Sequence, residues 1–523
     1  MAIFKLRPYQ VEGIEACMSI MTSSRKKSIV VAPTGAGKSH YISETVKRLK
    51  DIPIVILQPS KELLKQNYSK YVKAGGKASI YCASLKTKTV KKVDYTEIDG
   101  ELKKCREVSR ITYATIGSIK KDIDKLIKLG VKHVIVDEVH LQSKVGSQMR
   151  DFLKKLKATN VLGLTATPIY LQGGMNGSRL VMINRTFATI FPSISHVTQI
   201  KELVDSKFWT PFIYKIIKTD DSQLKLNTSG SDYTEYSQKL YYKSNNLQEQ
   251  IVEEVKKLKA EGRKRILVFV PSIEEANNLY GLIPNSAVVH SKLSTQERDL
   301  MIDEFTNGDI PVAINVNVLA TGYDNPEIDA IITSRPTSSI ALFYQQIGRG
   351  CRLHPDKKDC IITDFSGNTE RFGRVEDLTF EEIPHYGWGM WNGNGQLLSD
   401  YPIMTEIKPT KDSLIQAIKD EEELKRRIEE NRNKPQESKL KDYVRHLGKD
   451  GTPIFTFGKY NGKTVAQVQK ENEGYLTWIV EQYRKGEWNF YGVKGTILKN
   501  GIQKALRLPS LDPTEPPKPR LPF

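Results

Sequence analysis

The chain has 523 residues, enough for two large domains with smaller additions. Its 79 lysines and arginines against 61 aspartates and glutamates give a net charge of +18 and a pI near 9.3, which favours a polyanionic partner such as nucleic acid. No apolar run approaches the ~18 residues that span a bilayer, and the first residues lack an apolar signal core, so we expect a soluble, cytoplasmic protein with no membrane partner.

The first motif is Ala-Pro-Thr-Gly-Ala-Gly-Lys-Ser at 32–39, directly after the apolar run 28–31. A strand that enters a glycine-rich loop and leaves through a helix can hold phosphates, because backbone amides face the anion. We expect Lys38 to bind the β- and γ-phosphates of ATP and the Ser39 hydroxyl to ligate Mg²⁺. Ala32 stands where the strict pattern has glycine, so a glycine-rich turn beside a chance lysine is the alternative. The expected nucleotide-binding residues here are Thr34, Gly35, Ala36, Gly37, Lys38 and Ser39.

Residues 86–110 form a polar, lysine-rich insertion. A basic β-hairpin or loop that touches DNA is the favoured interpretation. Asp99, Glu101 and Lys103 superficially match a D-x-E-x-K nuclease signature, which we discount because no supporting β-sheet framework is evident from the sequence.

Asp137 and Glu138 follow a second apolar run, 133–136. With a phosphate loop upstream, Asp137 can hold Mg²⁺ directly or through water, while Glu138 polarises the attacking water for in-line displacement of the γ-phosphate. Two adjacent acids on a solvated loop are the alternative. His140 either couples this site to a second lobe or caps the turn.

The second half contains β-like runs at 265–270, 287–290, 311–316, 329–333 and 360–363 that alternate with helical stretches, which predicts a second α/β sheet. Arg349 and Arg352 lie three residues apart, so on a helix both guanidinium groups would share one face. Such a charge can stabilise a transferring γ-phosphoryl group and contribute ~10³–10⁵ in rate. Arginines on a solvated helix are the alternative.

These motifs resemble, in order and over roughly the first 370 residues, those of the superfamily-two helicases and translocases. The resemblance implies an α/β fold of two tandem RecA-like domains with parallel sheets, with ATP and Mg²⁺ as cofactors. It also implies that Arg7 and Gln10 recognise adenine and that Asp324 contacts the nucleotide, and it likens 164–168 to the segment that links hydrolysis to movement. The residues it implies in nucleic-acid contact are Pro59, Ser60, Thr115, Ser272 and Thr321.

Segments 6–10, 315–324, 344–352 and 364–368 are most similar to the RadD-type DNA-repair ATPases and phage helicases. This likeness implies a DNA motor in repair, recombination or replication, in a bacterial or phage-infected cell. Members of that group carry a cysteine-rich zinc module further on, whereas the last of the five cysteines here is Cys360 and none shows C-x-x-C spacing. A nucleotide-gated binding protein and an RNA helicase remain as alternatives.

We expect lobe 1 at 1–205, lobe 2 at 206–370, an aromatic accessory segment at 371–411 and a charged linker or helix at 412–449. The aromatic residues of the accessory segment either pack against lobe 2 or stack on unpaired bases; they are Tyr386, Trp388, Trp391 and Tyr401.

The last expected unit, 450–508, is a small α+β module similar to one at the C-terminus of exodeoxyribonuclease X-type enzymes. Lys459, Tyr460 and Lys463 suit nucleic-acid contact there, with a hairpin core as the alternative. A proline-rich extended tail follows at 509–523.

Overall fold

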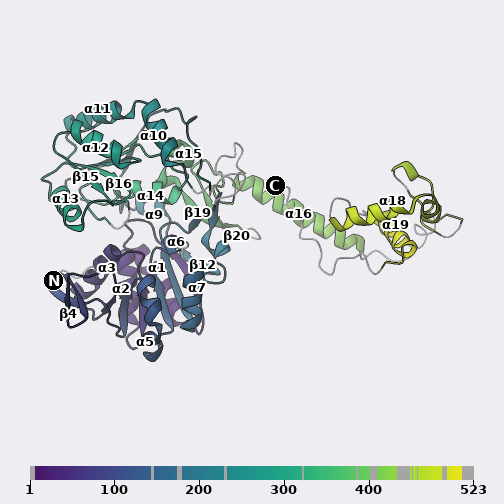
Figure 1. The fold of residues 1–523 in the computed structure, drawn as a ribbon, viewed down its shortest axis with the longest axis horizontal. Helices are drawn as coiled ribbons and strands as arrows, with labels where there is room; N and C mark the ends of the chain where they lie inside the picture. The colour runs from purple at the N-terminus through teal and green to yellow at the C-terminus, as the bar shows by residue number, and fades with distance from the viewer. Residues whose placement is uncertain are drawn as a thin grey trace. The chain divides into compact units, whose positions relative to one another are not determined.

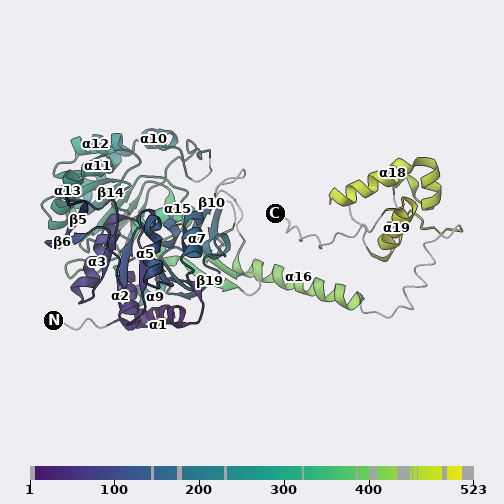
Figure 2. The same ribbon diagram turned by 60° about the horizontal axis from the view of Figure 1, so that its bottom comes forward.

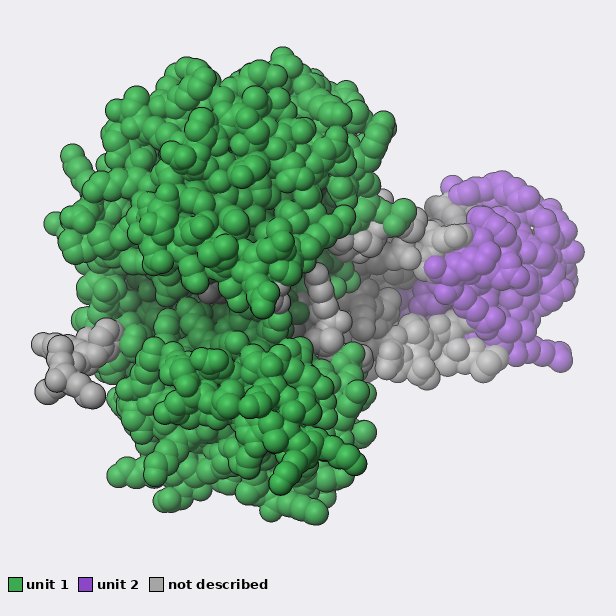
Figure 3. Space-filling view, turned by 60° about the vertical axis from the view of Figure 1, so that its left-hand side comes forward, with its two compact units in different colours: residues 1–415 green, residues 416–523 purple. Residues whose placement is uncertain are grey.

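The structure is a computed structural model of the whole chain. It describes residues 6–142, 146–172, 179–228, 232–320, 323–383, 387–400, 409–432, 448–449, 452–455, 458–485 and 492–508. The chain divides into two compact units, residues 1–415 and 416–523, shown in different colours in Figure 3.

The first lobe of unit 1 is built on a seven-stranded parallel sheet with the order β12-β1-β9-β8-β2-β7-β3. All but the edge strand β12 are almost wholly buried and rich in apolar residues, as expected when helices cover both faces of a parallel sheet, whereas β12 buries only Ile194. The strands are β1 (Lys27–Val31), β2 (Ile54–Leu57), β3 (Ser79–Tyr81), β7 (Ile111–Ala114), β8 (His133–Val136), β9 (Asn160–Thr165) and β12 (Ser193–Val197).

Helices pack around this sheet, and a short antiparallel pair, β10 (Ile169–Gln172) and β11 (Arg179–Met182), lies beside it. The helices are α1 (Pro8–Thr22), α2 (Lys38–Arg48), α3 (Lys61–Lys73), α4 (Ile116–Ile119), α5 (Ile123–Lys128), α6 (Val139–Gln142), α7 (Gly146–Lys155), α8 (Ile183–Thr186) and α9 (Ile200–Asp205).

The second lobe, above the first in Figure 1, contains a six-stranded parallel sheet with the order β13-β18-β17-β14-β16-β15. All five strand runs expected in the second half are strands of this sheet, which confirms the tandem RecA-like architecture. The strands are β13 (Phe212–Ile216), β14 (Ile266–Phe269), β15 (Ser286–His290), β16 (Val312–Val316), β17 (Ala330–Thr333) and β18 (Cys360–Asp364). The helices are α10 (Glu235–Ser244), α11 (Leu247–Ala260), α12 (Ile273–Leu282), α13 (Thr295–Asn307), α14 (Ile340–Ile347) and α15 (Asn368–Phe372).

The lysine-rich insertion is a three-stranded antiparallel sheet of β4 (Lys88–Val90), β5 (Val93–Ile98) and β6 (Glu101–Lys104). Both of its two-residue turns have positive φ at both positions, 47° and 68° at Lys91–Lys92 and 52° and 77° at Asp99–Gly100. This is the geometry that matches the twist of tight hairpins.

The nuclease-like triplet does not converge on one point in this sheet. Asp99 lies in the turn and pairs with Lys73 of α3, whereas Glu101 and Lys103 pair with each other. A β-framework is therefore present, contrary to the sequence expectation, but the described residues form no cluster of potential metal ligands.

The accessory segment packs mainly against lobe 1. This corrects the expectation that its aromatic residues pack against lobe 2. It contains η3 (Val375–Asp377) and a hairpin of β19 (Thr379–Ile383) and β20 (Gly387–Trp391). Gln199 exchanges hydrogen bonds of 2.6 and 3.1 Å with the backbone of Phe380, and Arg185 lies 2.6 Å from the Asp400 carboxylate. Trp391 is buried, Trp388 is half-buried, and Tyr386 and Tyr401 lie outside the described residues.

The charged linker begins as one helix, α16 (Lys411–Arg432), which crosses the division between the units. The C-terminal module contains η4 (Gly458–Tyr460), α18 (Val465–Lys485), α19 (Gly492–Ala505) and an antiparallel bridge between Ile454 and Thr464. Figure 2 shows α18 and α19 side by side. The tail at 509–523 lies outside the described residues. Within the part of the chain that the structure describes, no helix is both long and apolar enough to cross a membrane.

Candidate nucleotide site between the two lobes

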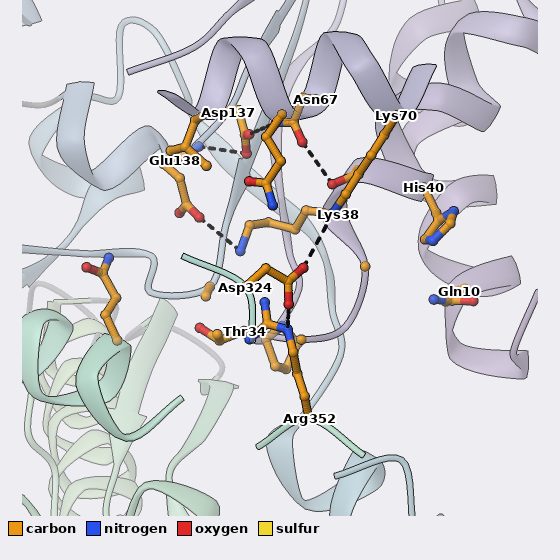
Figure 4. Close-up of a pocket in the computed structure, with 18 of the residues that line it drawn as sticks. Gln10, Thr34, Lys38, His40, Asn67, Lys70, Asp137, Glu138, Asp324 and Arg352 are labelled. Carbon is orange, nitrogen blue, oxygen red and sulfur yellow. Dashed lines mark hydrogen bonds and ion pairs between the residues drawn. The ribbon is translucent and has the colours of Figure 1, made fainter. Parts of the chain in front are cut away.

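A cavity of about 300 Å³ lies between the two lobes of unit 1, at the carboxyl ends of β1 and β8 (Figure 4). Ligands of open parallel sheets bind at this edge because the strand-end loops converge there. The lining combines the glycine-rich loop and the paired acids of lobe 1 with three charged groups of lobe 2, which are Asp324, Arg349 and Arg352.

The glycine-rich loop has the backbone that a phosphate cradle requires. Gly35 and Gly37 have φ of 79° and 92°, in the left-handed region that favours glycine, and Gly37 precedes α2. A Cβ on Gly37 would lie 2.8 Å from Nε2 of Gln10, so the loop passes close to α1. The predicted phosphate ligand Lys38 is therefore the first residue of α2, with its side chain in the cavity.

Lys38 and the paired acids form one buried charge cluster. Lys38 Nζ lies 3.1 Å from Glu138 Oε1, and both side chains are only 14 % exposed. Asp137, 3 % exposed, accepts hydrogen bonds from the Glu138 amide at 3.0 Å and from Asn67 Nδ2 at 3.0 Å. The Ser39 hydroxyl donates to Asn67 Oδ1 at 2.9 Å. Asn67, on α3, thus bridges the two residues predicted to ligate Mg²⁺.

Sequence reasoning missed Asn67, because one asparagine on a helix carries no signal of its own. Its position on α3 gives it this role. Lys70, one turn further on the same helix, also lines the cavity.

Burial sets the charge states in this cluster. Burial, together with the charge of Glu138, raises the pKa of Asp137 to about 7. Burial also opposes ionisation of Glu138, but Lys38, His140 and Arg349 outweigh it and lower the pKa of that carboxyl. Burial, with Arg352 nearby, lowers the pKa of Arg349 to about 10. The site is thus arranged around a lysine–glutamate pair, with Asp137 poised to ionise.

The donors present fit Mg²⁺ and a polyphosphate. A serine hydroxyl and a carboxylate are hard oxygen ligands of the kind that Mg²⁺ takes alongside phosphates. Two buried atoms of cavity-lining residues, Glu138 Oε2 and Arg352 Nη1, have no hydrogen-bond partner among the described residues, although His140 Nδ1 lies 3.4 Å from Glu138 Oε2. Buried polar atoms normally find partners, so their state indicates a polar ligand.

Arg349 and Arg352 both line the cavity but do not lie on a helix, which corrects the sequence expectation. Helix α14 ends at Ile347, Arg349 lies in the turn at Gly348–Gly350, and Arg352 lies in the irregular segment that follows. The Arg349 guanidinium donates to the backbone carbonyl of Tyr323. Arg352 pairs with Asp324, whose other oxygen lies 3.5 Å from Lys70 Nζ of lobe 1 (Figure 4).

The two lobes also meet around Thr34 of the loop. Its amide donates to the Tyr344 hydroxyl at 3.0 Å, and its carbonyl accepts from Trp209 Nε1 at 3.0 Å. A Cβ on Gly348 would lie 2.9 Å from Thr34 Cγ2, so α14 approaches the loop closely.

His140 of lobe 1 contacts the other lobe directly. Its Nε2 lies 2.6 Å from Gln345 Nε2 and its Nδ1 lies 2.9 Å from the Thr165 hydroxyl. Burial lowers the pKa of His140, which favours the neutral ring. His140 therefore lies at the contact between the two lobes, and its coupling role stays a prediction.

The expected adenine-recognition residues lie at the rim of the same cavity. Gln10 Nε2 donates to the Ala36 carbonyl at 2.9 Å, and Gln10 Oε1 accepts from the Arg7 amide at 3.0 Å. The Arg7 guanidinium lies 4.4 Å from the centre of the Phe208 ring.

None of the described residues predicted to touch nucleic acid lines the cavity. Pro59 and Ser60 follow β2, Thr115 follows the neighbouring β7, and Ser60 caps α3 through the Leu63 amide at 3.2 Å. Ser272 is buried and donates to Glu275. Thr321 lies outside the described residues.

Three family models match the chain. They are the type III restriction enzyme res subunit over residues 3–170, the helicase conserved C-terminal domain over 245–354 and the exodeoxyribonuclease X-like C-terminal domain over 455–483. The first two cover the two lobes that enclose the cavity.

Among similar proteins, one assigned as the ATP-dependent helicase IRC3 of Saccharomyces cerevisiae is 25 % identical, with 69 % of this chain and 51 % of the relative covered. One assigned as the mitochondrial ATP-dependent helicase irc3 of Schizosaccharomyces pombe is 30 % identical, with 72 % and 59 % covered. The chain thus spans little more than half of these relatives' lengths. A shorter match, 35 % identical over 97 residues, joins 17 % of this chain to 20 % of the S. cerevisiae ATP-dependent RNA helicase DBP5.

A fragment assigned as the HsdR subunit of a type I restriction enzyme from Vibrio vulnificus shares the fold, with a TM-score of 0.50, 18 % identity, and 71 % of this chain and 66 % of that chain covered. The chain therefore contains a domain similar to the type III restriction enzyme res subunit, followed by a helicase conserved C-terminal domain, on the two RecA-like lobes that enclose the cavity.

Proposed function

We propose that the protein is a DNA-dependent ATPase that couples ATP hydrolysis to movement on, or remodelling of, DNA in repair, recombination or replication. The observation that carries the proposal is the convergence of Lys38, Glu138, Arg349 and Arg352 on one cavity from two lobes. A seam that is complete only when the lobes meet can convert hydrolysis into relative motion of the lobes.

The residues divide the chemistry between the lobes. Ser39 and Asp137 would hold Mg²⁺, which would neutralise charge on the β- and γ-phosphates. Lys38 holds the same phosphates, while Glu138 accepts a hydrogen bond from the attacking water and orients it toward the γ-phosphorus. Arg349 and Arg352 stabilise the charge that develops on the transferring phosphoryl group. Arg7 and Gln10 hold the adenine. Asp324 positions the Arg352 side chain beside the nucleotide.

DNA is the preferred substrate because the first lobe matches a restriction-enzyme subunit and the chain is strongly basic. Pro59, Ser60, Thr115, Ser272 and Thr321 remain the proposed strand-contacting positions. The match to an RNA helicase is one specific observation in favour of RNA as the second candidate.

Steady-state ATPase assays with single-stranded, duplex and forked DNA and with RNA test the proposal. We expect DNA to stimulate ATP turnover. Lys38→Ala should lower the turnover rate by about 10²-fold or more, since the phosphate contact is lost. Stimulation by RNA alone would favour the second candidate. Absence of stimulation by any ligand would leave a nucleotide-gated binder, and full turnover by Lys38→Ala would refute the assigned site.

A further inference from the structure

The C-terminal module contains a row of aromatic rings that begins in its core and ends in solvent. Phe455 is fully buried, and its ring centre lies 6.1 Å from that of Tyr475 on α18. Tyr475 in turn stacks on Trp478, with ring centres 5.7 Å apart and planes 20° apart. The Trp478 side chain is 51 % exposed, so a rigid support holds a large apolar surface in water.

A lysine lies over these rings. Lys459 Nζ is 4.9 Å from the centre of the Tyr460 ring and 5.5 Å from that of Tyr475. Gly458 has φ of 65°, and a Cβ there would lie 3.2 Å from the Tyr475 hydroxyl, so the turn is held against the aromatic row. Among the described residues, no carboxylate lies within ion-pair distance of Lys459, whereas the neighbouring Lys463 is 2.6 Å from Glu471.

The charge of the module is complementary to a polyanion. Residues 452–508 contain nine lysines and arginines against four glutamates. An exposed indole accepts any nucleobase on its face, and a cation beside the aromatic row can neutralise the adjoining phosphate. A purely apolar partner would match the rings but not the lysine above them.

We propose that Trp478 and Tyr475 form a stacking platform for an unpaired base and that Lys459 contacts the flanking phosphate, so that the module binds single-stranded nucleic acid without ATP. This site goes beyond the proposed ATPase, because it involves neither the nucleotide cavity nor hydrolysis. It gives the protein a second nucleic-acid-binding site, which lies in unit 2.

The test measures binding by the full chain without nucleotide, using fluorescence anisotropy. Two labelled ligands of equal length are compared, an oligothymidylate and an abasic oligonucleotide with the same number of phosphates. We expect Trp478→Ala to weaken oligothymidylate binding by about 5-fold or more and to leave abasic binding unchanged, because only stacking is lost. Trp478→Phe retains a ring and should bind nearly as the parent does.

Lys459→Ala should weaken both ligands and lower the slope of log affinity against log salt by about one, because a single phosphate contact is removed. Tyr280→Ala is the matched control, since Tyr280 is 57 % exposed but belongs to unit 1. Photo-crosslinking with 5-iodouracil in the oligonucleotide should map to the peptide that contains Trp478.

Equal loss of both ligands on Trp478→Ala, or unchanged binding of both, would overturn the platform. Crosslinks confined to unit 1 would do the same. The ATPase proposal fails by a different result, absent stimulation of turnover, so the two outcomes are distinguishable.

Discussion

Single residues of the nucleotide site are held by partners from other elements. Asp137 depends on Asn67 of α3, Lys38 on Glu138 after β8, and Arg352 on Asp324. Because buried charges are costly without their partners, removal of one partner affects both stability and chemistry. Asn67 gives the sharpest test, since it belongs to no recognised motif.

Asn67→Ala should lower the free energy of unfolding by about 1–3 kcal/mol, because the buried Asp137 carboxylate loses a hydrogen-bond donor. Asn67→Asp should be more destabilising in EDTA, where a third carboxyl stands beside Asp137 and Glu138, and Mg²⁺ should restore part of that loss. Thermal melts with EDTA and with Mg²⁺ measure both effects.

Gln66→Ala is the control for Asn67, because Gln66 precedes it on α3 and lines the same cavity. A Gln66 variant as unstable as Asn67→Ala would mean that the helix, rather than the bridge, was disturbed. Mg²⁺-independent melting of Asn67→Asp would contradict the assigned metal position.

At the scale of elements, the accessory segment also contacts lobe 2 through a partly buried glutamate. The Tyr214 hydroxyl of β13 donates to Glu376 Oε2 of η3 at 2.8 Å. Burial raises the pKa of Glu376 above 4.5. The folded protein therefore keeps this proton at pH values where the unfolded chain has released it, and the free energy of unfolding falls as pH rises from about 4.5 through the raised pKa.

Glu376→Gln should remove that pH dependence while it keeps an oxygen acceptor for Tyr214. The stability of the variant relative to the parent should thus increase as pH rises from about 4.5 toward 8. Thermal melts across this range test it, with Glu382→Gln, an exposed glutamate of the neighbouring β19, as the control. A constant difference between Glu376→Gln and the parent across all pH values would contradict the expectation.

Local sequence patterns predicted most strands and helices, but they predicted less well where each element ends and what it packs against. The apolar runs of β1, β8 and five strands of the second sheet are unambiguous, because strands buried on both faces are almost wholly apolar, whereas the partly exposed β13 was not predicted. The end of α14 before Arg349 was not evident, since periodicity continues through Gln345–Arg352 and only the glycines at 348 and 350 mark the turn. One of the two alternatives for Trp391 was packing in the protein, and this side chain is buried. Its aromatic character could not specify which lobe covers it.

For the nucleotide site, the sequence predicted which residues take part, whereas their contacts depend on the topology of the fold. Sequence spacing indicated Lys38, Asp137 and Glu138, because strand-end loops of one parallel sheet converge. Contacts such as Asn67–Asp137 or Tyr344–Thr34 join residues 70 and 310 positions apart, and no local pattern encodes such pairs.

For the molecule as a whole, closure of the lobes is the property to test, and Gly348 lies at the point of approach. Its backbone is right-handed helical, with φ of −61°, a conformation that alanine adopts readily, although an added Cβ would lie 3.0 Å from the Tyr344 carbonyl oxygen of the same lobe. An added Cβ would nevertheless lie 2.9 Å from Thr34 Cγ2 across the seam. Gly348→Ala should therefore hinder closure while each lobe still folds.

We expect Gly348→Ala to lower kcat by about 10-fold or more, because a displacement of about 1 Å at a catalytic seam can cost about 10²-fold. Binding of a fluorescent ATP analogue to lobe 1 should change less than turnover. Gly281→Ala is the matched control, since Gly281 also lies in a helix of lobe 2 but has open space around its Cβ position. Equal kcat for the two variants would mean that the observed approach is not needed for turnover.

The attachment of Thr34 to Tyr344 and Trp209 bears on how inhibitors of this protein should be sought. A truncated polypeptide that ends before residue 206 would leave both backbone groups of Thr34 without these side-chain partners. Compounds selected against that fragment would meet a loop with exposed donors and acceptors that are already engaged in the intact chain. Screening campaigns should accordingly use a protein that retains both lobes, or their hits will report affinity for a surface that is covered when the two lobes are present.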